Sequence, residues 1–337
     1  MRIFHCNHFV AAVFLPLIAA MSIPSSTASA AEAQPRKVHM AYSAFSAPSL
    51  WFLLGKNLGF FQEERLAPEF VLVRGGSLAV KGLMAGNFDY AHNTGVIMDA
   101  AIRTRQPLKV IFTAGTIHFW LVAQPEIRAV TDLRGKVIGI SSLGSSSDFA
   151  TREILKRHGL NPLKETTLLQ AGGPQERFTA LTSKALDATV LTHPFTFKAL
   201  GMGYRRLAKA NEYLRWPAEG LAIREDKAIQ DPEEVSGMVR ASLKGLRFIL
   251  AHKEFVIAKM MQMFRLTRDE AADTYEALRE ESLPSGQLSH EEIVTAIEIT
   301  KQAANVTEVI SPERIFDNRF VKQAEQELRN WKPPIPR

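Results

Sequence analysis

The fold is decided by the stretch Asp132-Leu133-Arg134-Gly135-Lys136-Val137-Ile138-Gly139-Ile140-Ser141-Ser142-Leu143-Gly144-Ser145-Ser146-Ser147-Asp148. Within it, Val137–Ile140 is a short apolar run and Ser142–Ser147 is a polar loop, after which apolar residues recur at roughly helical spacing. This order of strand, loop and helix aims backbone N–H groups and hydroxyls at one spot, which suits an anion or a polar head group. An ordinary helix N-cap at Ser147 or Asp148 explains the stretch equally well, so the rest of the chain has to decide.

The same order of strand, polar loop and helix recurs from Arg36 to Arg224. We expect strands at 36–42, 68–73, 89–92, 109–114, 119–123, 137–140, 167–170, 187–191, 205–210 and 220–224, with the first helix at 50–61. This repeat predicts two α/β units, each with a mostly parallel sheet and helices on both faces. From Pro232 onward the pattern is almost purely helical, and we expect helices at 233–251, 253–264, 268–280, 290–303 and 319–331.

Polar loops follow the strands of the first unit. In mostly parallel sheets, ligands bind at the carboxyl ends of the strands, so these loops are candidate binding elements. They are Ala44–Ser49, Gly75–Ser77, Asn93–Gly95 and Gly115–His118. None of the four contains Arg or Lys. This weakens the case for a small bare anion as ligand and favours a larger solute.

Composition and charge indicate a soluble globular protein. The chain has 337 residues, of which 46% are hydrophobic and 23% charged. Its formal net charge is +6, but Lys and Arg are scattered among Asp and Glu. We interpret the excess as a mild bias towards anionic partners and expect no nucleic-acid binding.

The first thirty residues resemble a secretory signal peptide. Arg2 is followed by an apolar run at 9–21 and by the small-residue cleavage pattern Ala28-Ser29-Ala30. We therefore expect export to the periplasm with cleavage near Ala30, the alternative being an uncleaved anchor. The single cysteine, Cys6, lies in this segment, so the mature chain has no thiol for a disulfide, a nucleophile or a metal ligand.

Three motifs carry a resemblance to a known family. They are Asp132–Ile140 followed by Gly144-Ser145, the turn Ala85-Gly86-Asn87-Phe88-Asp89-Tyr90-Ala91, and a similar turn at 181–189. They resemble the periplasmic solute-binding proteins of ABC transporters, in particular the nitrate/sulfonate/taurine-binding and thiamine-precursor-binding family. The resemblance covers residues 36 to about 225.

This resemblance implies the type II fold of periplasmic binding proteins: two α/β lobes, a hinge with two crossings and a helical C-terminal part. Lobe one would comprise 36–123 plus 222–337, and lobe two 124–221, with crossings near Ala123–Gln124 and Ala218–Leu221. A small molecule would bind between the lobes, and lobe closure would be sensed by an ABC permease and ATPase complex in the inner membrane. We expect a monomer, no cofactor and no metal.

Twelve residues are candidate ligand contacts, taken from the loops at strand ends and from the two crossings. They are Ser46, Ser49, Trp51, Gly76, Ser77, Asn93, Thr94, His118, Ser145, Ser146, His193 and Glu219. Each has a structural alternative: a helix cap for Ser, Thr and Asn, core packing for the aromatic residue, a satisfied turn residue for His193 and a solvated charge for Glu219. Arg74 and Arg177 are possible anion clamps, but the alternative of a surface charge is favoured for both.

The leading functional hypothesis is a non-catalytic binding protein for a sulfonate, a carboxylate or a pyrimidine-like solute. A sensor module that presents the solute to a receptor has the same sequence features. An enzyme on the same fold is the third alternative; the enzymes of this kind that the family suggests need a thiol, and the chain has no His-Glu-x-x-His, Gly-x-Ser-x-Gly or phosphate-loop motif.

Overall fold

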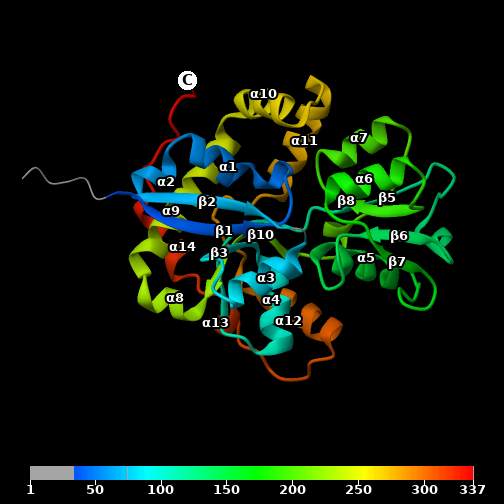
Figure 1. The fold of residues 1–337 in the computed structure, drawn as a ribbon, viewed down its shortest axis with the longest axis horizontal. Helices are drawn as coiled ribbons and strands as arrows, with labels where there is room; N and C mark the ends of the chain where they lie inside the picture. Colours follow the sequence, from blue (N-terminus) through cyan, green and yellow to red (C-terminus); the bar gives the residue numbers. More distant parts are fainter. Residues whose placement is uncertain (1–33, 74, 337) are drawn as a thin grey trace, which may run out of the picture. The chain divides into compact units, whose positions relative to one another are not determined.

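Two five-stranded sheets organise the computed structural model, which describes residues 34–73 and 75–336 (Figure 1). The expected signal peptide and its cleavage site lie outside the described residues, as does Arg74. The first sheet contains, in spatial order, β2 (Leu66–Leu72), β1 (Arg36–Tyr42), β3 (Tyr90–Asn93), β10 (Pro217–Arg224) and β4 (Leu108–Thr116). The second contains β7 (Thr167–Gln170), β6 (Val137–Ile140), β8 (Ala188–Leu191), β5 (Trp120–Ala123) and β9 (Arg205–Lys209).

Both sheets are mixed: in each, four of the five strands run in the same direction, as expected for a mostly parallel sheet, and one strand runs against them. In the first sheet, β1 is parallel to β2 and β3, while β10 runs antiparallel to its neighbours β3 and β4. In the second sheet, β6 is parallel to β7 and β8, while β5 runs antiparallel to β8 and β9. We call each sheet with the helices packed on it a lobe, lobe one containing β10 and lobe two containing β5.

The strands β5 and β10 show where the chain passes between the sheets. It leaves the first sheet after Thr116 and enters the second at Trp120; it returns between Lys209 and Pro217. These passages lie a few residues before the crossings expected from the sequence. The lobe boundaries themselves stay a prediction, and sheet membership favours moving β5 to lobe two and the start of β10 to lobe one.

The helices lie close to their predicted positions, with three exceptions. They are α1 (Leu50–Asn57), α2 (Phe60–Glu63), α3 (Gly76–Met84), α4 (Thr94–Thr104), α5 (Ser146–Arg157), α6 (Pro174–Thr182), α7 (Phe195–Gly201), α8 (Glu225–Gln230), α9 (Pro232–Ala251), α10 (Lys253–Phe264), α11 (Arg268–Glu281), α12 (His290–Ala304), α13 (Pro312–Ile315) and α14 (Arg319–Glu327). The predicted helix 50–61 is divided into α1 and α2 because Gly59 adopts a left-handed conformation with φ of 84°. The short helices α8 and α13 were not predicted.

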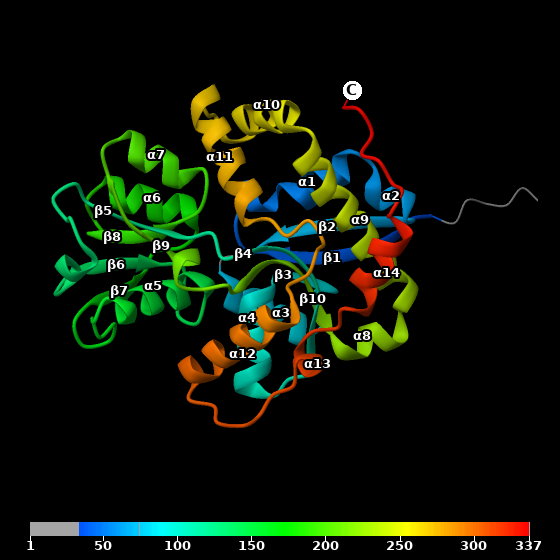
Figure 2. The ribbon, with the colours of Figure 1, turned by 180° about the vertical axis from the view of Figure 1, so that it is seen from behind.

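The C-terminal helices complete lobe one. α9 packs against α1, α2 and α14, and Figure 2 shows α9 and α14 side by side. The crossing of α1 and α9 is close because Gly55 and Gly245 face each other, with a new Cβ on Gly55 only 3.6 Å from the Gly245 Cα. A Cβ on Gly245 would overlap the carbonyl of Trp51. The helical C-terminal part is thus fixed to the first helix of the chain by a backbone contact.

Replacement of Gly245 by Ala should destabilise the protein by about 1–3 kcal/mol, since the added methyl group forces α1 and α9 apart. Gly201→Ala is a matched control at the end of α7, where a new Cβ meets nothing within 4 Å and the greater helix propensity of Ala should leave stability unchanged or slightly higher. Urea unfolding of both variants measures the difference. Equal stability of the two variants would contradict the close crossing.

Candidate ligand-binding cleft

A cavity of about 40 Å³ lies where the two lobes meet. Lobe one and the two passages between the sheets contribute Ser43, Ala44, Gly76, Asn93, His118, Phe119, Ala218 and Glu219. Lobe two contributes Ser141, Ser145, Ser146, Ser147, Gly173, Pro174, Arg177 and Thr192. The space suffices for a few water molecules, so an organic solute enters only if the lobes move apart.

The lobes are joined directly by hydrogen bonds. Ser77 Oγ donates to the Leu143 carbonyl at 3.1 Å, and the Ala47 N–H donates to the His193 carbonyl at 3.1 Å. Lys198 Nζ of α7 donates to the Phe264 carbonyl at 2.9 Å. The structure is therefore that of a closed cleft.

The stretch from Ser141 to Asp148 forms the lobe-two wall of the cleft. Ser145, rather than Ser147 or Asp148, is the N-cap of α5, and its hydroxyl accepts a hydrogen bond from the Asp148 N–H at 3.3 Å. Ser141 Oγ donates to Ser145 Oγ at 2.8 Å, and the Ser141 N–H donates to Ser147 Oγ at 2.8 Å. Ser146 lines the cavity, and no side-chain hydrogen bond of its hydroxyl is seen among the described residues. The loop that caps α5 thus also forms the lobe-two wall of the cleft.

Arg177 is the most unusual residue of the cleft. It lines the cavity with only 1% of its surface exposed, so the expectation of a surface charge was wrong. Its Nε donates to the Val190 carbonyl at 3.1 Å and its Nη1 to the Gly172 carbonyl at 2.6 Å. Burial lowers the pKa of Arg177 to about 10, opposed by the negative charge of Glu176. Within residues 34–73 and 75–336, no carboxylate forms an ion pair with it.

On the lobe-one side, Glu219 lies between two histidines. His92 Nε2 is 2.6 Å from Glu219 Oε2, and His118 Nε2 is 3.3 Å from Glu219 Oε1. The shorter contact is misaligned for a hydrogen bond, so we treat it as electrostatic. Burial raises the pKa of Glu219, but the neighbouring His92 and His118 outweigh burial, and the pKa lies below its ordinary value of 4.5. Glu219 is therefore an ionised, buried carboxylate at neutral pH and not the solvated charge of the alternative.

Six of the twelve candidate residues line this cavity: Gly76, Asn93, His118, Ser145, Ser146 and Glu219. The other six do not line it: Ser46, Ser49, Trp51, Ser77, Thr94 and His193. No bound ligand tests any of these assignments, so all twelve stay predictions.

The six residues away from the cavity are occupied elsewhere. Ser49 Oγ donates to the Ala44 carbonyl at 2.9 Å, Ser46 is the N-cap of the short 3-10 helix 47–49, and Ser77 bridges the lobes. Trp51 is buried in the lobe-one core against Phe52, His92 and Phe112, and Thr94 is buried at the start of α4. His193 is buried 3.4 Å from Glu281 of α11, which joins the two lobes.

The sequence interpretation left His92 and Ser141 out of the candidate set and did not select Arg177. A signal for Arg177 exists in the helix pattern, because Pro174, Arg177 and Leu181 are the buried positions of α6. An arginine inside an apolar helical stripe has to be buried with a partner or face a cavity. His92 lies on the same face of β3 as Tyr90, in a strand of four residues of which three are buried, so its pattern gave no comparable signal.

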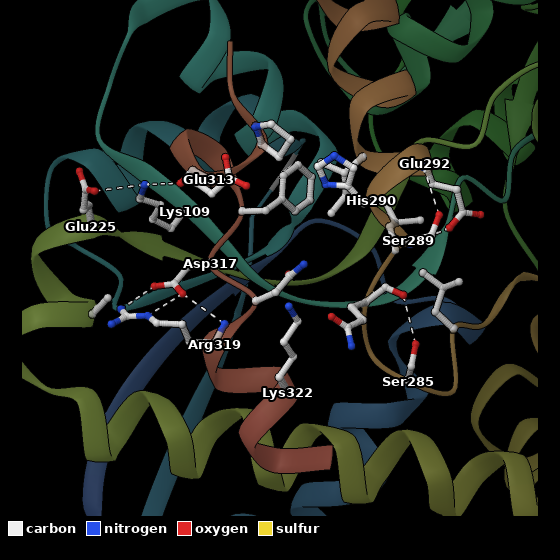
Figure 3. A pocket seen from close by; sticks show the side chains of 18 of the residues that line it. Lys109, Glu225, Ser285, Ser289, His290, Glu292, Glu313, Asp317, Arg319 and Lys322 are labelled. Atoms are coloured by element: carbon white, nitrogen blue, oxygen red, sulfur yellow. Dashed lines mark hydrogen bonds and ion pairs between the residues drawn. The ribbon is translucent and has the colours of Figure 1, made fainter. Parts of the chain in front are cut away.

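A larger hollow of about 1000 Å³ lies on lobe one alone (Figure 3). Two of its charged pairs lie within the hollow: Lys109 Nζ is 3.1 Å from Glu225 Oε1, and Arg319 Nη2 is 2.7 Å from Asp317 Oδ2. Glu292 is engaged with Ser289 in the capping box of α12. We favour the smaller cavity as the ligand site because its charged groups come from both lobes and Arg177 lacks a protein partner.

The described residues lack two features of other classes of protein. They contain no group of three or more His, Cys, Asp or Glu side chains placed to hold a metal ion. Nor does any of their helices combine the length and apolar character needed to cross a membrane.

Comparison with known proteins identifies the family. The NMT1/THI5 like family model matches residues 48–254. The chain belongs to the NMT1/THI5-like family. It is also 25% identical over 296 residues to the riboflavin-binding protein RibY of Chloroflexus aurantiacus, covering 80% of this chain and 82% of RibY.

Two solved structures show the same fold. One is the ligand binding component of an ABC-type import system from Staphylococcus aureus with zinc bound, with a TM-score of 0.67, 14% identity and coverage of 86% of this chain and 99% of that one. The other is the alkanesulfonate-binding protein SsuA from Xanthomonas axonopodis pv. citri bound to MOPS, with a TM-score of 0.69, 18% identity and coverage of 87% and 98%. The predicted periplasmic-binding-protein fold is confirmed. The names of both neighbours describe ligand-binding components.

The pH dependence of stability tests the electrostatics of Glu219. Since the pKa of Glu219 in the folded protein lies below 4.5, its ionised form stabilises the fold above that ordinary value. This contribution is lost as the pH falls from 4.5 towards the lowered pKa. The difference in unfolding free energy between wild type and Glu219→Gln should therefore be largest near neutral pH and shrink below pH ~4.5. Urea unfolding from pH 3 to 7 measures it, and a difference independent of pH would contradict the assignment.

Proposed function

We propose that this chain is the exported substrate-binding component of an ABC importer and captures a small organic or anionic solute between its two lobes. The observation that carries the proposal is the cleft itself, in which both lobes present buried polar groups to one cavity. Among these groups, Arg177 is a buried cation without a carboxylate partner in the described part of the chain. Leaving such a charge unpaired is costly for a fold, and ligand binding is a reason to retain it. Membership of the family supports the same function.

The proposed cycle uses the contacts between the lobes. The solute binds while the lobes are apart, and closure brings the wall formed by Ser141–Asp148 against it. The hydrogen bonds of Ser77 with Leu143 and of Ala47 with His193 then hold the closed form. We propose that a permease and ATPase complex in the inner membrane distinguishes this closed form from the open one. The signal-peptide pattern at residues 1–30 supports a periplasmic location for the monomer.

A thermal-shift screen of the mature chain tests the proposal. The panel contains sulfonates, carboxylates, nitrate, pyrimidines and riboflavin, the last because of the name of the relative RibY. A ligand present at about 100 times its Kd should stabilise the folded protein by about 2.7 kcal/mol and so raise Tm by several degrees. A flat screen in which one of the compounds is chemically converted would contradict the proposal and favour an enzyme.

A bulky side chain at position 146 should block the cleft without unfolding the protein. The ring of Ser146→Phe is too large for the closed cavity and should obstruct lobe closure while leaving the cap at Ser145 intact, so affinity for the best ligand of the screen should fall at least about 10-fold. Ser183→Phe, on the exposed C-cap of α6, is the matched control and should bind as wild type does. Isothermal titration calorimetry measures both. Unchanged affinity of Ser146→Phe would remove the α5 wall from the binding site.

A further inference from the structure

The guanidinium of Arg177 has unused binding capacity inside the cleft. Of its five N–H groups, two donate to the carbonyls of Val190 and Gly172. The remaining three have no acceptor among the described residues, although the side chain is buried and lines the cavity. Buried charges in proteins are paired or bind a ligand, and guanidinium matches the two oxygens of a carboxylate, sulfonate or phosphate.

The opposite wall of the cavity carries a charge of the other sign. Glu219 lines the same cavity from β10 of lobe one and is ionised at neutral pH because His92 and His118 lower its pKa. An ionised carboxylate only accepts hydrogen bonds, so it favours a ligand N–H or ammonium group and repels an anion. The nearest polar neighbours of Glu219 are the ring nitrogens of the two histidines.

These two charges do not neutralise each other. No ion pair joins Arg177 to Glu219, and they belong to different lobes, so a direct pair would form only across the space that the ligand occupies. Each charge is instead held by its own lobe, Arg177 by two backbone carbonyls and Glu219 by two histidines. A ligand that satisfies both has to reach from one lobe to the other.

We infer that the cleft selects an organic anion that also carries an N–H donor at its other end, with the anionic group on Arg177 and the donor on Glu219. This inference rests on the proposed function and specifies the ligand for the same site. It disfavours a bare inorganic anion, which would satisfy Arg177 but bring no N–H donor to Glu219 and would be repelled by its charge. It also excludes a neutral solute, which would leave the buried Arg177 uncompensated.

The inference is tested with the mature protein and four probes. Three share one skeleton: 3-aminobenzenesulfonate has both groups, benzenesulfonate has only the anion, and 3-aminobenzamide has only neutral N–H groups. Riboflavin is the fourth, as a large neutral solute. Wild type should bind 3-aminobenzenesulfonate most tightly, benzenesulfonate less tightly and the neutral probes weakest, as measured by calorimetry and Tm.

Three variants test separately the contact of Arg177 with the ligand's anionic group and the contact of Glu219 with its N–H donor. Arg177→Gln should weaken binding of both sulfonates at least about 30-fold while leaving the neutral probes unchanged, since it removes one partner of a desolvated charge pair. Arg177→Lys keeps the charge and should retain part of the affinity. Glu219→Gln should reduce the affinity for 3-aminobenzenesulfonate to that for benzenesulfonate. Arg152→Gln is the matched control, because Arg152 pairs with Asp148 outside this cavity.

The outcomes distinguish this inference from the proposed function. If riboflavin or 3-aminobenzamide binds most tightly and Arg177→Gln leaves that affinity unchanged, the inference is overturned and solute capture stands. If benzenesulfonate binds as tightly as its amino derivative, and Glu219→Gln changes neither, the assignment of Glu219 is overturned. If neither sulfonate raises Tm of the wild type, the inference is overturned, whereas the proposed function is decided separately by the wider thermal-shift screen.

Discussion

The structure depends on one strand, β10, which lies in the first sheet between β3 and β4. It runs antiparallel to both. β10 is the neighbour of β3 on the side away from β1, and it is the strand that joins β4 to the sheet. Gly220 is required in it, because a Cβ there would overlap the Phe112 carbonyl. Lobe one is therefore incomplete until the chain has passed through lobe two and returned. The same strand carries Glu219, so the element that closes the first sheet also sets one wall of the cleft.

The cleft contains two buried charges of opposite sign, Arg177 and Glu219, that do not form an ion pair with each other. Burial penalises the charge of Arg177 and that of Glu219, yet each is kept by local contacts rather than by an opposite charge across the cavity. The hydroxyls of Ser141, Ser145 and Ser147 are consumed by one another and by the cap of α5. The polar loop is thus a rigid surface, and the groups free to recognise a ligand are few.

The sequence was sufficient to predict the fold because each α/β step has its own local signals. The strand at 137–140 and the capping boxes at Thr267 and Ser289 depend on residues near one another in the chain. Sheet membership does not: the apolar run Trp120–Ala123 is equally compatible with either sheet, and only tertiary pairing places it beside β8 and β9.

The site was only partly predictable for a related reason. Strand-end loops were the right place to search, and six of the selected residues do line the cavity. However, the sequence could not distinguish a serine that caps a short helix, such as Ser46, from one that faces the cavity, such as Ser146. Arg177 was assigned to the surface on the general behaviour of arginine, although its position in the buried stripe of α6 pointed the other way.

The position of β10 also has a kinetic consequence. Ala222 pairs with Ala91 and Val110, partners separated from it by more than a hundred residues of chain. Closing a loop of that length costs entropy before any contact repays it, and folds dominated by such pairings form slowly. Until β10 arrives, β3 and β4 present unpaired backbone edges, which are templates for association with other chains. The slowest and most aggregation-prone stage of folding should therefore be the one in which the first sheet is formed without β10.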